Sequence, residues 1–264
     1  MTMLTGWKKP RTHSGQGDGS SDKRDKYLGE VMKRLLLGRR WRYLRYLHLR
    51  EGFLFAKGVE SVLSIGSGHG YSELALALEF PHVHFHLTDI ETDKSPYYGP
   101  TQNLVKTWGV NNVTFGVHDI LKPTTQRFDL VTSIEVLEHI ENDSLAAAQM
   151  RAAANRYVFV LVPFGDKAAN ADAKLRQRVM ENHEHFRVGY DAEDLRALFP
   201  SVVTIRGCYW KGRGQEFRKR LYDMTDDQVR DSIEDLQGEA LGDIDTFIPT
   251  VYPEAQGIWM VARA

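Results

Sequence analysis

Glycines at regular spacing mark the part of this chain best suited to hold a nucleotide-like ligand. Residues 62–70 read Val-Leu-Ser-Ile-Gly-Ser-Gly-His-Gly, an apolar run that ends in Gly66, Gly68 and Gly70. Glycine tolerates positive φ and has no Cβ, so the backbone can turn sharply and approach a ligand closely. A helical pattern begins at Tyr71, and the first N–H groups of a helix lack partners within it. The pattern predicts a strand, a glycine turn and a helix that together bind a cofactor, although glycine turns of this kind are equally typical of plain connections.

Two later strands each end in an acidic residue. Asp89 closes an apolar stretch about 20 residues after the glycines, the spacing at which a carboxylate accepts hydrogen bonds from ribose hydroxyls. Asp119 follows a third predicted strand at 113–117. Either acid alone is more typical of a turn or a helix cap. Their placement after successive strands favours cofactor binding.

The fourth predicted strand, 128–133, runs into a distinctive loop with the sequence FDLVTSIEVLEHI at 128–140. Here the chain resembles the class I S-adenosylmethionine (SAM)-dependent methyltransferases. It is most similar to the small-molecule branch that includes ubiquinone- and menaquinone-biosynthesis enzymes. The resemblance extends over 59–163 and, more loosely, over 183–200.

The resemblance implies a set of SAM-binding residues in the glycine turn, in the acid-ended strands, in the loop after the fourth strand and in an N-terminal helix. The glycine turn and the fourth-strand loop would contact the methionine part. One acid would accept the ribose hydroxyls and the other the adenine amino group. The implied residues are Arg45 (or Arg42), Ser64, Gly66, Ser67, Gly68, Asp89, Ile90, Asp119, Ile120, Ser133 and Glu135.

Ser64 departs from the family pattern, which has Asp or Glu two residues before the first glycine. Its presence leaves three alternatives open: a weakened site, a substitute group elsewhere, or a pseudoenzyme. If the serine only weakens a usable site, Ser64→Asp should preserve or improve SAM binding.

Two histidines are candidates for the catalytic side. His139 follows Glu138 in the fourth-strand loop and could act as a general base near neutral pH, with a structural role as the alternative. His185 precedes a predicted strand–helix junction near which relatives also carry a histidine. We expect no metal site: His183 and His185 are two residues apart and diverge on a helix or strand. His82, His84 and His86 lack clustered carboxylates or cysteines.

The element pattern predicts an α/β fold. Strands at 60–65, 83–88, 113–117, 128–133 and 156–162 alternate with helices at 71–79, 99–108 and 143–154, and further strands are expected at 202–205 and 258–261. Short connections imply a parallel sheet covered on both faces. The family adds an antiparallel last strand, which gives a Rossmann-like, doubly wound, seven-stranded sheet.

We expect one methyltransferase domain over 27–264 behind a disordered leader at 1–26. A basic helix is predicted within 27–57. An insertion at 207–250 would act as a cap, with a helix at 226–241 capped by Thr225 and Gln228. Together with 164–187 it is expected to form the acceptor pocket.

Composition fits an ordinary cytoplasmic enzyme: 264 residues, 42% hydrophobic and 26% charged. Cys208 is the single cysteine, which excludes an internal disulfide. Residues 1–57 hold 14 Lys and Arg against 5 Asp and Glu, within an overall net charge of −1. This basic region could attract an anionic partner, but a packed helix with a solvated basic face is favoured.

The predicted function is methyl transfer from SAM to an O, N or C atom of a small-molecule acceptor, with neither nucleic acid nor an integral membrane as partner. The oligomeric state stays open. A nucleic-acid-directed methyltransferase or binder that uses the basic region is the alternative. A nicotinamide-dependent oxidoreductase is disfavoured because Tyr71 stands where the last glycine of Gly-x-Gly-x-x-Gly belongs.

Overall fold

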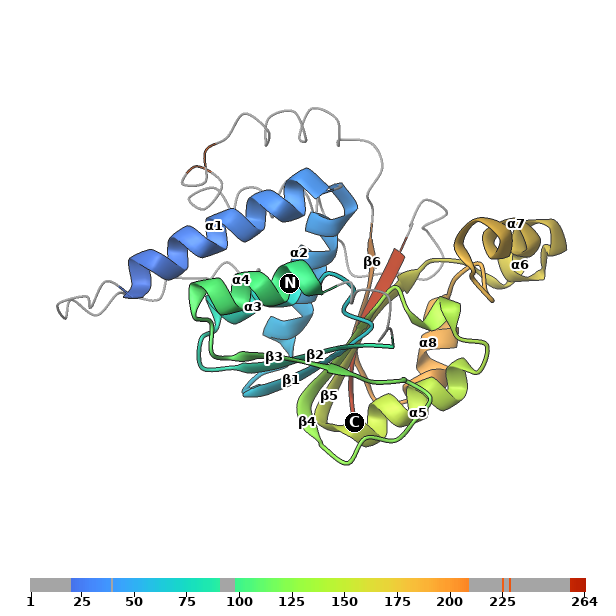
Figure 1. Cartoon of the computed structure of the whole chain (residues 1–264). Coiled ribbons are helices and arrows are strands. Elements are labelled where there is room, and N and C mark those ends of the chain that lie inside the picture. Colours follow the sequence, from blue (N-terminus) through green and yellow to red (C-terminus); the bar gives the residue numbers. More distant parts are fainter. Residues whose placement is uncertain (1–19, 39, 91–97, 209–224, 226–227, 229–256) are drawn as a thin grey trace, which may run out of the picture.

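A seven-stranded sheet forms the centre of the computed structural model, which describes residues 20–38, 40–90, 98–208, 225, 228 and 257–264 (Figure 1). The strand order is β3-β2-β1-β4-β5-β7-β6. Strand β7 runs antiparallel to β5 and β6, and the other pairs are parallel. This confirms the predicted fold. The strands are β1 (Ser61–Ile65), β2 (His84–Asp89), β3 (Val113–Val117), β4 (Phe128–Ile134), β5 (Ala154–Pro163), β6 (Val202–Cys208) and β7 (Gly257–Arg263).

Helices cover both faces of this sheet. In Figure 1, α1 to α4 lie over one face, α5 and α8 over the other, and α6 and α7 project to the side. The helices are α1 (Ser20–Gly38), α2 (Arg40–Phe55), α3 (Tyr71–Glu79), α4 (Gly99–Trp108), α5 (Asp143–Ala153), α6 (Lys167–Ala171), α7 (Ala173–His183) and α8 (Ala192–Leu198), with a short 3-10 helix η1 (Leu137–His139).

The N-terminal region differs from the expectation in two ways. Helix α1 begins at Ser20 rather than at residue 27, and two helices replace the single one expected. The rest of the expected leader lies outside the described residues. Of the expected cap at 207–250, the structure describes residues 207, 208, 225 and 228 alone. There the predicted capping box is confirmed: Thr225 N–H donates to Gln228 Oε1 at 2.8 Å, and Gln228 N–H donates to Thr225 Oγ1 at 3.3 Å.

The two faces of the sheet carry separate apolar cores. Helices α1, α2 and α3 pack with Phe85 and Trp259 on one face, and α5 and α8 pack with Val131 and Met260 on the other. Central strands are therefore buried on both sides, which explains the unbroken apolar run in β5. No described helix is long and apolar enough to cross a membrane.

A buried ion pair links helix α2 to helix α3. The Arg50 guanidinium donates to both carboxylate oxygens of Glu79, and the Nε–Oε1 distance is 2.8 Å. The Arg50 side chain is 6% exposed and that of Glu79 is 14% exposed. On α1, Arg34 pairs with Glu30 at 2.7 Å. Carboxylates thus partner arginines of the basic region, which supports the packed-helix interpretation and orients α2 toward the sheet.

The sheet order reverses beside β1, since β2 lies on one side of it and β4 on the other. In open α/β sheets the ligand crevice lies outside the carboxyl ends of the strands at such a switch point. The glycine turn follows β1, and the loop that begins at Glu135 follows β4. The fold therefore brings both segments to one edge of the sheet.

Candidate active site

A cavity of about 270 Å³ lies at the carboxyl ends of β1 and β4. Helices α1 and α2 supply one wall, and the glycine turn with the start of α3 supplies the other. Of the residues predicted to bind the cofactor, the lining includes Arg45, Gly66, Ser67, Gly68 and Glu135, together with the alternative cation Arg42. The complete lining is Leu35, Arg42, Arg45, Gly66, Ser67, Gly68, His69, Gly70, Tyr71, Ser72, Glu73, Ile134 and Glu135.

The three glycines of the turn are required by its backbone. Gly66, Gly68 and Gly70 have φ values of 69°, 54° and 67°, in the left-handed region that side chains disfavour. A Cβ on Gly66 would collide with the side chain of Val136, and one on Gly70 would meet Leu87 at 2.5 Å. At Gly68 a Cβ would meet nothing within 4 Å, so this position faces open space. The turn is thus packed on two sides and open where a ligand would lie.

Ser64 does not leave the site without an acid. Its hydroxyl donates to Glu73 Oε1 at 2.7 Å, and both residues are buried. Glu73 stands in the first turn of α3 and lines the cavity. Burial raises the pKa of Glu73, and the hydrogen bond from Ser64 opposes that rise. A carboxylate on α3, which the sequence analysis did not identify, thus lies beside the position on β1 where the family carries an acid.

This contact changes the expectation for Ser64→Asp. The substitution would put a second carboxylate within hydrogen-bond distance of Glu73, and two such groups cannot both stay ionised without a large cost. We expect SAM affinity to fall about tenfold, or about 1.4 kcal/mol, in Ser64→Asp. The double variant Ser64→Asp/Glu73→Gln should recover most of that loss in calorimetric titrations. Binding by Ser64→Asp as tight as that of the natural chain would refute the role given to Glu73.

Arg45 and Glu135 form an ion pair across the cavity mouth. Arg45 Nη2 lies 2.5 Å from Glu135 Oε2, and the two side chains are 23% and 17% exposed. Glu135 has a φ of 56°, one of two positive values among the described non-glycine residues. Burial raises the pKa of Glu135, and the Arg45 charge lowers it. The unusual backbone turns this carboxylate toward α2.

Several polar atoms around the cavity are buried without a hydrogen-bond partner in the described part of the chain. They include Ser67 Oγ, Ser133 Oγ and Glu135 Oε1. Ser133 pairs with Ile65 in the β1–β4 ladder, directly before the glycine turn. Buried polar groups are normally hydrogen-bonded, so these atoms are suited to bind polar groups of a ligand.

Asp89 ends strand β2, Asp119 follows strand β3, and neither residue lines the cavity. Asp89 Oδ2 accepts from Gly68 N–H at 2.9 Å, and Oδ1 accepts from Ile90 N–H at 2.8 Å. Asp119 Oδ1 accepts from Leu121 N–H at 3.0 Å. Both acids therefore support turns, yet each oxygen retains a lone pair. Ile90 is 65% exposed and free to cover a ligand.

Ile120 differs from Ile90, because its side chain is 4% exposed and packs in the core beside α5. Its backbone alone is left for a ligand, as the resemblance implied. Residues 91–97, which follow Ile90, lie outside the described residues.

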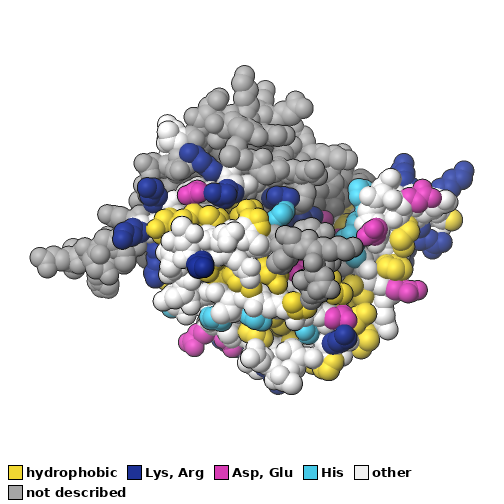
Figure 2. All heavy atoms as spheres, viewed as in Figure 1, with side chains coloured by type: hydrophobic (Ala, Val, Ile, Leu, Met, Phe, Trp, Pro, Cys, Tyr) yellow, Lys and Arg dark blue, Asp and Glu magenta, His cyan; other side chains and the backbone are white. Residues whose placement is uncertain are grey.

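The two predicted catalytic histidines come together on the other side of Glu135. The ring centroids of His139 and His185 lie 4.5 Å apart in an edge-to-face arrangement. Buried Glu138 joins them, although the sequence analysis assigned it no role. Figure 2 shows histidine side chains at the junction between the sheet and the α6–α7 segment. The contact between His139 in η1 and His185, 46 positions later, could not be predicted from local sequence spacing.

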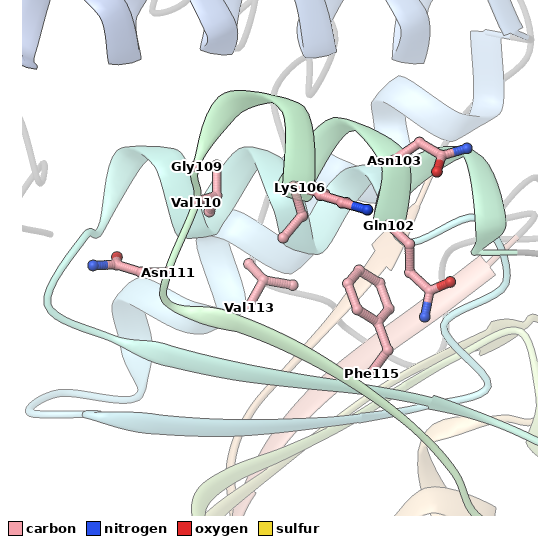
Figure 3. A pocket seen from close by; sticks show the side chains of 9 residues that line it. Gln102, Asn103, Lys106, Gly109, Val110, Asn111, Val113 and Phe115 are labelled. Atoms are coloured by element: carbon pink, nitrogen blue, oxygen red, sulfur yellow. The ribbon is translucent and has the colours of Figure 1, made fainter.

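A second cavity, of about 540 Å³, lies between α4 and the edge strand β3 (Figure 3). Its lining includes Phe115 and Val113 from the strand and Gln102 and Lys106 from the helix. Its lining holds one titratable residue, Lys106, and one glycine, Gly109, which caps α4, and it includes no predicted site residue. We regard it as a surface groove and not as the reaction site.

Comparisons with known proteins agree with this geometry. The family model described as "Methyltransferase domain" matches residues 37–201. No curated protein sequence matches the chain.

Solved structures share the fold at low sequence identity. A protein of Bacillus halodurans assigned as a methyltransferase is 16% identical, with a TM-score of 0.55 and coverage of 81% of this chain and 97% of that one. A Galdieria sulphuraria protein assigned as a sarcosine dimethylglycine methyltransferase is 14% identical, with a TM-score of 0.58 and coverage of 85% and 87%. The N-methyltransferase NodS from Bradyrhizobium japonicum, in complex with S-adenosyl-L-homocysteine (SAH), is 17% identical, with a TM-score of 0.52 and coverage of 89% and 97%.

Proposed function

Because this chain belongs to the class I methyltransferase family, we propose that it transfers the methyl group of SAM to a small-molecule acceptor. The observation that carries this proposal is the pair of opposite charges in the cavity. Arg42 and Arg45 stand on one wall, and Glu73 with Ser64 stands on the other. SAM has an amino-acid end with one carboxylate and one ammonium group, and a nicotinamide dinucleotide has none.

The methionine end of SAM would lie between these walls. Its carboxylate would pair with Arg45, and its ammonium group would donate to Glu73. The unsatisfied hydroxyls of Ser67 and Ser133 are further partners for polar atoms of this end. Glu135 already neutralises part of the Arg45 charge, so cofactor binding would rearrange that ion pair.

The nucleoside end would extend toward the carboxyl ends of β2 and β3. The free lone pairs of Asp89 would accept the two ribose hydroxyls, since a carboxylate offers two oxygens. Asp119 would accept from the adenine amino group, and Ile90 would cover the ring. Residues that now stabilise the turns would thus gain a second role, as the resemblance implies.

The methyl transfer requires little from the protein beyond aligning the acceptor atom with the methyl group of SAM. The methyl carbon of SAM is electrophilic because it is bound to a sulfonium, so an acceptor atom attacks in line as the carbon–sulfur bond breaks and the electron pair stays on sulfur. A base is needed only where the acceptor must lose a proton. His139 and His185, whose rings are in contact, would be the candidates for this base.

The relatives support a small acceptor. The Galdieria protein is assigned to sarcosine and dimethylglycine, which are small molecules, and NodS holds SAH. The chain should therefore transfer labelled methyl groups from SAM to a component of a metabolite extract, with the product identified by mass spectrometry. Stabilisation of the purified chain by NADH but not by SAH in thermal melts would contradict the proposal.

A further inference from the structure

Glu138, His139 and His185 form a compact group of ligand-type atoms. One atom from each residue lies within 4.8 Å of the atoms of the other two. Around a metal ion with bonds of about 2.1 Å, ligand atoms lie about 3.0 to 4.2 Å apart. If the three ligand atoms moved some tenths of an ångström closer together, the three side chains would therefore bind one ion.

Glu138 is a buried acid whose side chain is not hydrogen-bonded by any described residue. It is 0% exposed, and neither carboxylate oxygen has a hydrogen-bond partner among the residues that the structure describes. A buried carboxylate without a partner is costly, and such groups are normally paired or bound to a metal. A cation at this position would supply the missing partner.

A backbone contact orients one of the two histidines, His139. His139 Nδ1 lies 3.3 Å from the carbonyl oxygen of Glu184. If that nitrogen carries the proton and donates it there, Nε2 keeps its lone pair, which is the arrangement usual for metal-binding histidines.

The backbone holds the group in place with unusual local geometry. In the part of the chain that the structure describes, Glu135 and Glu184 are the two non-glycine residues with positive φ, and they flank this group. Phe186 N–H donates to the Glu138 carbonyl at 2.8 Å, which joins the segment after α7 to η1. Uncommon backbone conformations of this kind concentrate at functional sites.

Arg187 then anchors the segment that carries His185. Its guanidinium lies 2.8 Å from Asp143 Oδ2 and 3.1 Å from Asp194 Oδ1, so it links α5 to α8. It also covers the Tyr190 ring at 4.4 Å. The third ligand is therefore positioned by a set of fixed contacts.

We propose that Glu138, His139 and His185 bind one divalent transition-metal ion on the acceptor side of the cofactor cavity. Two imidazoles and one carboxylate favour Mn²⁺, Fe²⁺, Co²⁺ or Zn²⁺ over Ca²⁺. Glu135 lines the cofactor cavity and interacts electrostatically with Glu138 and His139, so the ion would lie next to the methyl donor.

The ion also defines an acceptor class, an inference that rests on the proposed function. Three protein ligands leave coordination positions open, and a hydroxyl oxygen of the acceptor would occupy one of them. A metal-bound hydroxyl ionises more readily. Its proton passes to water, its oxygen forms the new bond to the methyl carbon, and the sulfur keeps the electron pair of the broken bond. The acceptor is thus a hydroxyl compound that is methylated on oxygen.

Calorimetric titration of the metal-stripped full chain with Mn²⁺, without a histidine tag, tests the site independently of activity. We expect one site per chain, and we expect Glu138→Gln and His185→Asn each to weaken binding about 100-fold. His183→Asn is the matched control, since this neighbouring histidine lies outside the group, and it should bind Mn²⁺ as the natural chain does. If Glu138→Gln does not fold, the half-buried His185 still supplies a usable variant.

Metal binding unchanged in His185→Asn, or absent from the natural chain, would overturn the metal site. A second assay follows labelled methyl transfer to a catechol with and without a chelator, and SAH binding is measured in parallel. Transfer lost with chelator while SAH still binds supports the acceptor class, whereas metal-independent transfer overturns it. Loss of SAH binding in the metal-loaded natural chain would refute the proposed function and leave the metal site standing.

Discussion

Replacing Asp89 by alanine is expected to lower SAM affinity roughly 5- to 150-fold. The substitution removes the proposed acceptor of the ribose hydroxyls, and leaving such donors unpaired costs about 1–3 kcal/mol. It also removes the hydrogen bond that Gly68 N–H donates to Asp89 Oδ2 at 2.9 Å, so the glycine turn loses a stabilising contact at its open position. Calorimetry with SAM on the folded variant measures both effects together.

Asp129 supplies a matched control for this experiment. Its Oδ2 accepts from the backbone N–H groups of Glu60 and Ser61, at 2.9 and 3.2 Å, where β1 begins. Like Asp89, it is a carboxylate that supports backbone amides, but it lies at the opposite end of β1 from the glycine turn. Asp129→Ala should lower the melting temperature and leave SAM affinity unchanged. Equal losses of affinity in both variants would mean that Asp89 acts through fold stability alone.

Arg50→Ala is expected to lower the free energy of unfolding by about 3–5 kcal/mol. Removing one partner of a buried ion pair leaves an uncompensated charge, here Glu79, and such losses are large. The phenol of Tyr46 donates to the same carboxylate at 3.2 Å and would be its remaining partner. Urea unfolding followed by circular dichroism gives the difference directly.

The exposed ion pair on α1 provides a control for the Arg50→Ala prediction. Arg34 and Glu30 are 40% and 39% exposed, and exposed pairs contribute about 0–1 kcal/mol. Arg34→Ala should therefore change stability far less than Arg50→Ala. Since α2 also carries Arg45, partial loss of its packing in Arg50→Ala should weaken SAM binding as well. An Arg50→Ala chain as stable as Arg34→Ala would refute the buried-pair interpretation.

The sheet could be predicted from the sequence because its signals are local. Apolar runs such as Val62–Ile65 and Val158–Val162 mark buried strands, and the glycines at 66, 68 and 70 mark the turn that follows. The capping box at Asp191 and Asp194 is likewise short-range, and the structure contains both of its hydrogen bonds. Such patterns depend on backbone conformational preferences that are set by residues close together in the sequence.

The parts that were missed depend on contacts between distant segments. Glu73 looks like an ordinary first-turn acid until the fold places it 2.7 Å from Ser64. Glu138 looks like one polar residue in an apolar motif until the segment after α7 brings His185 beside it. Nothing local predicts either encounter, because both follow from the way helices pack on the finished sheet.

A crystal structure of the chain with SAH is the most direct test of the central claim. We expect the SAH amino-acid end between Arg45 and Glu73, the ribose at Asp89 and the sulfur facing the group formed by Glu138, His139 and His185. SAH bound in the groove between α4 and β3, or absent from crystals grown at saturating concentration, would contradict the assignment of this cavity as the methyl-transfer site.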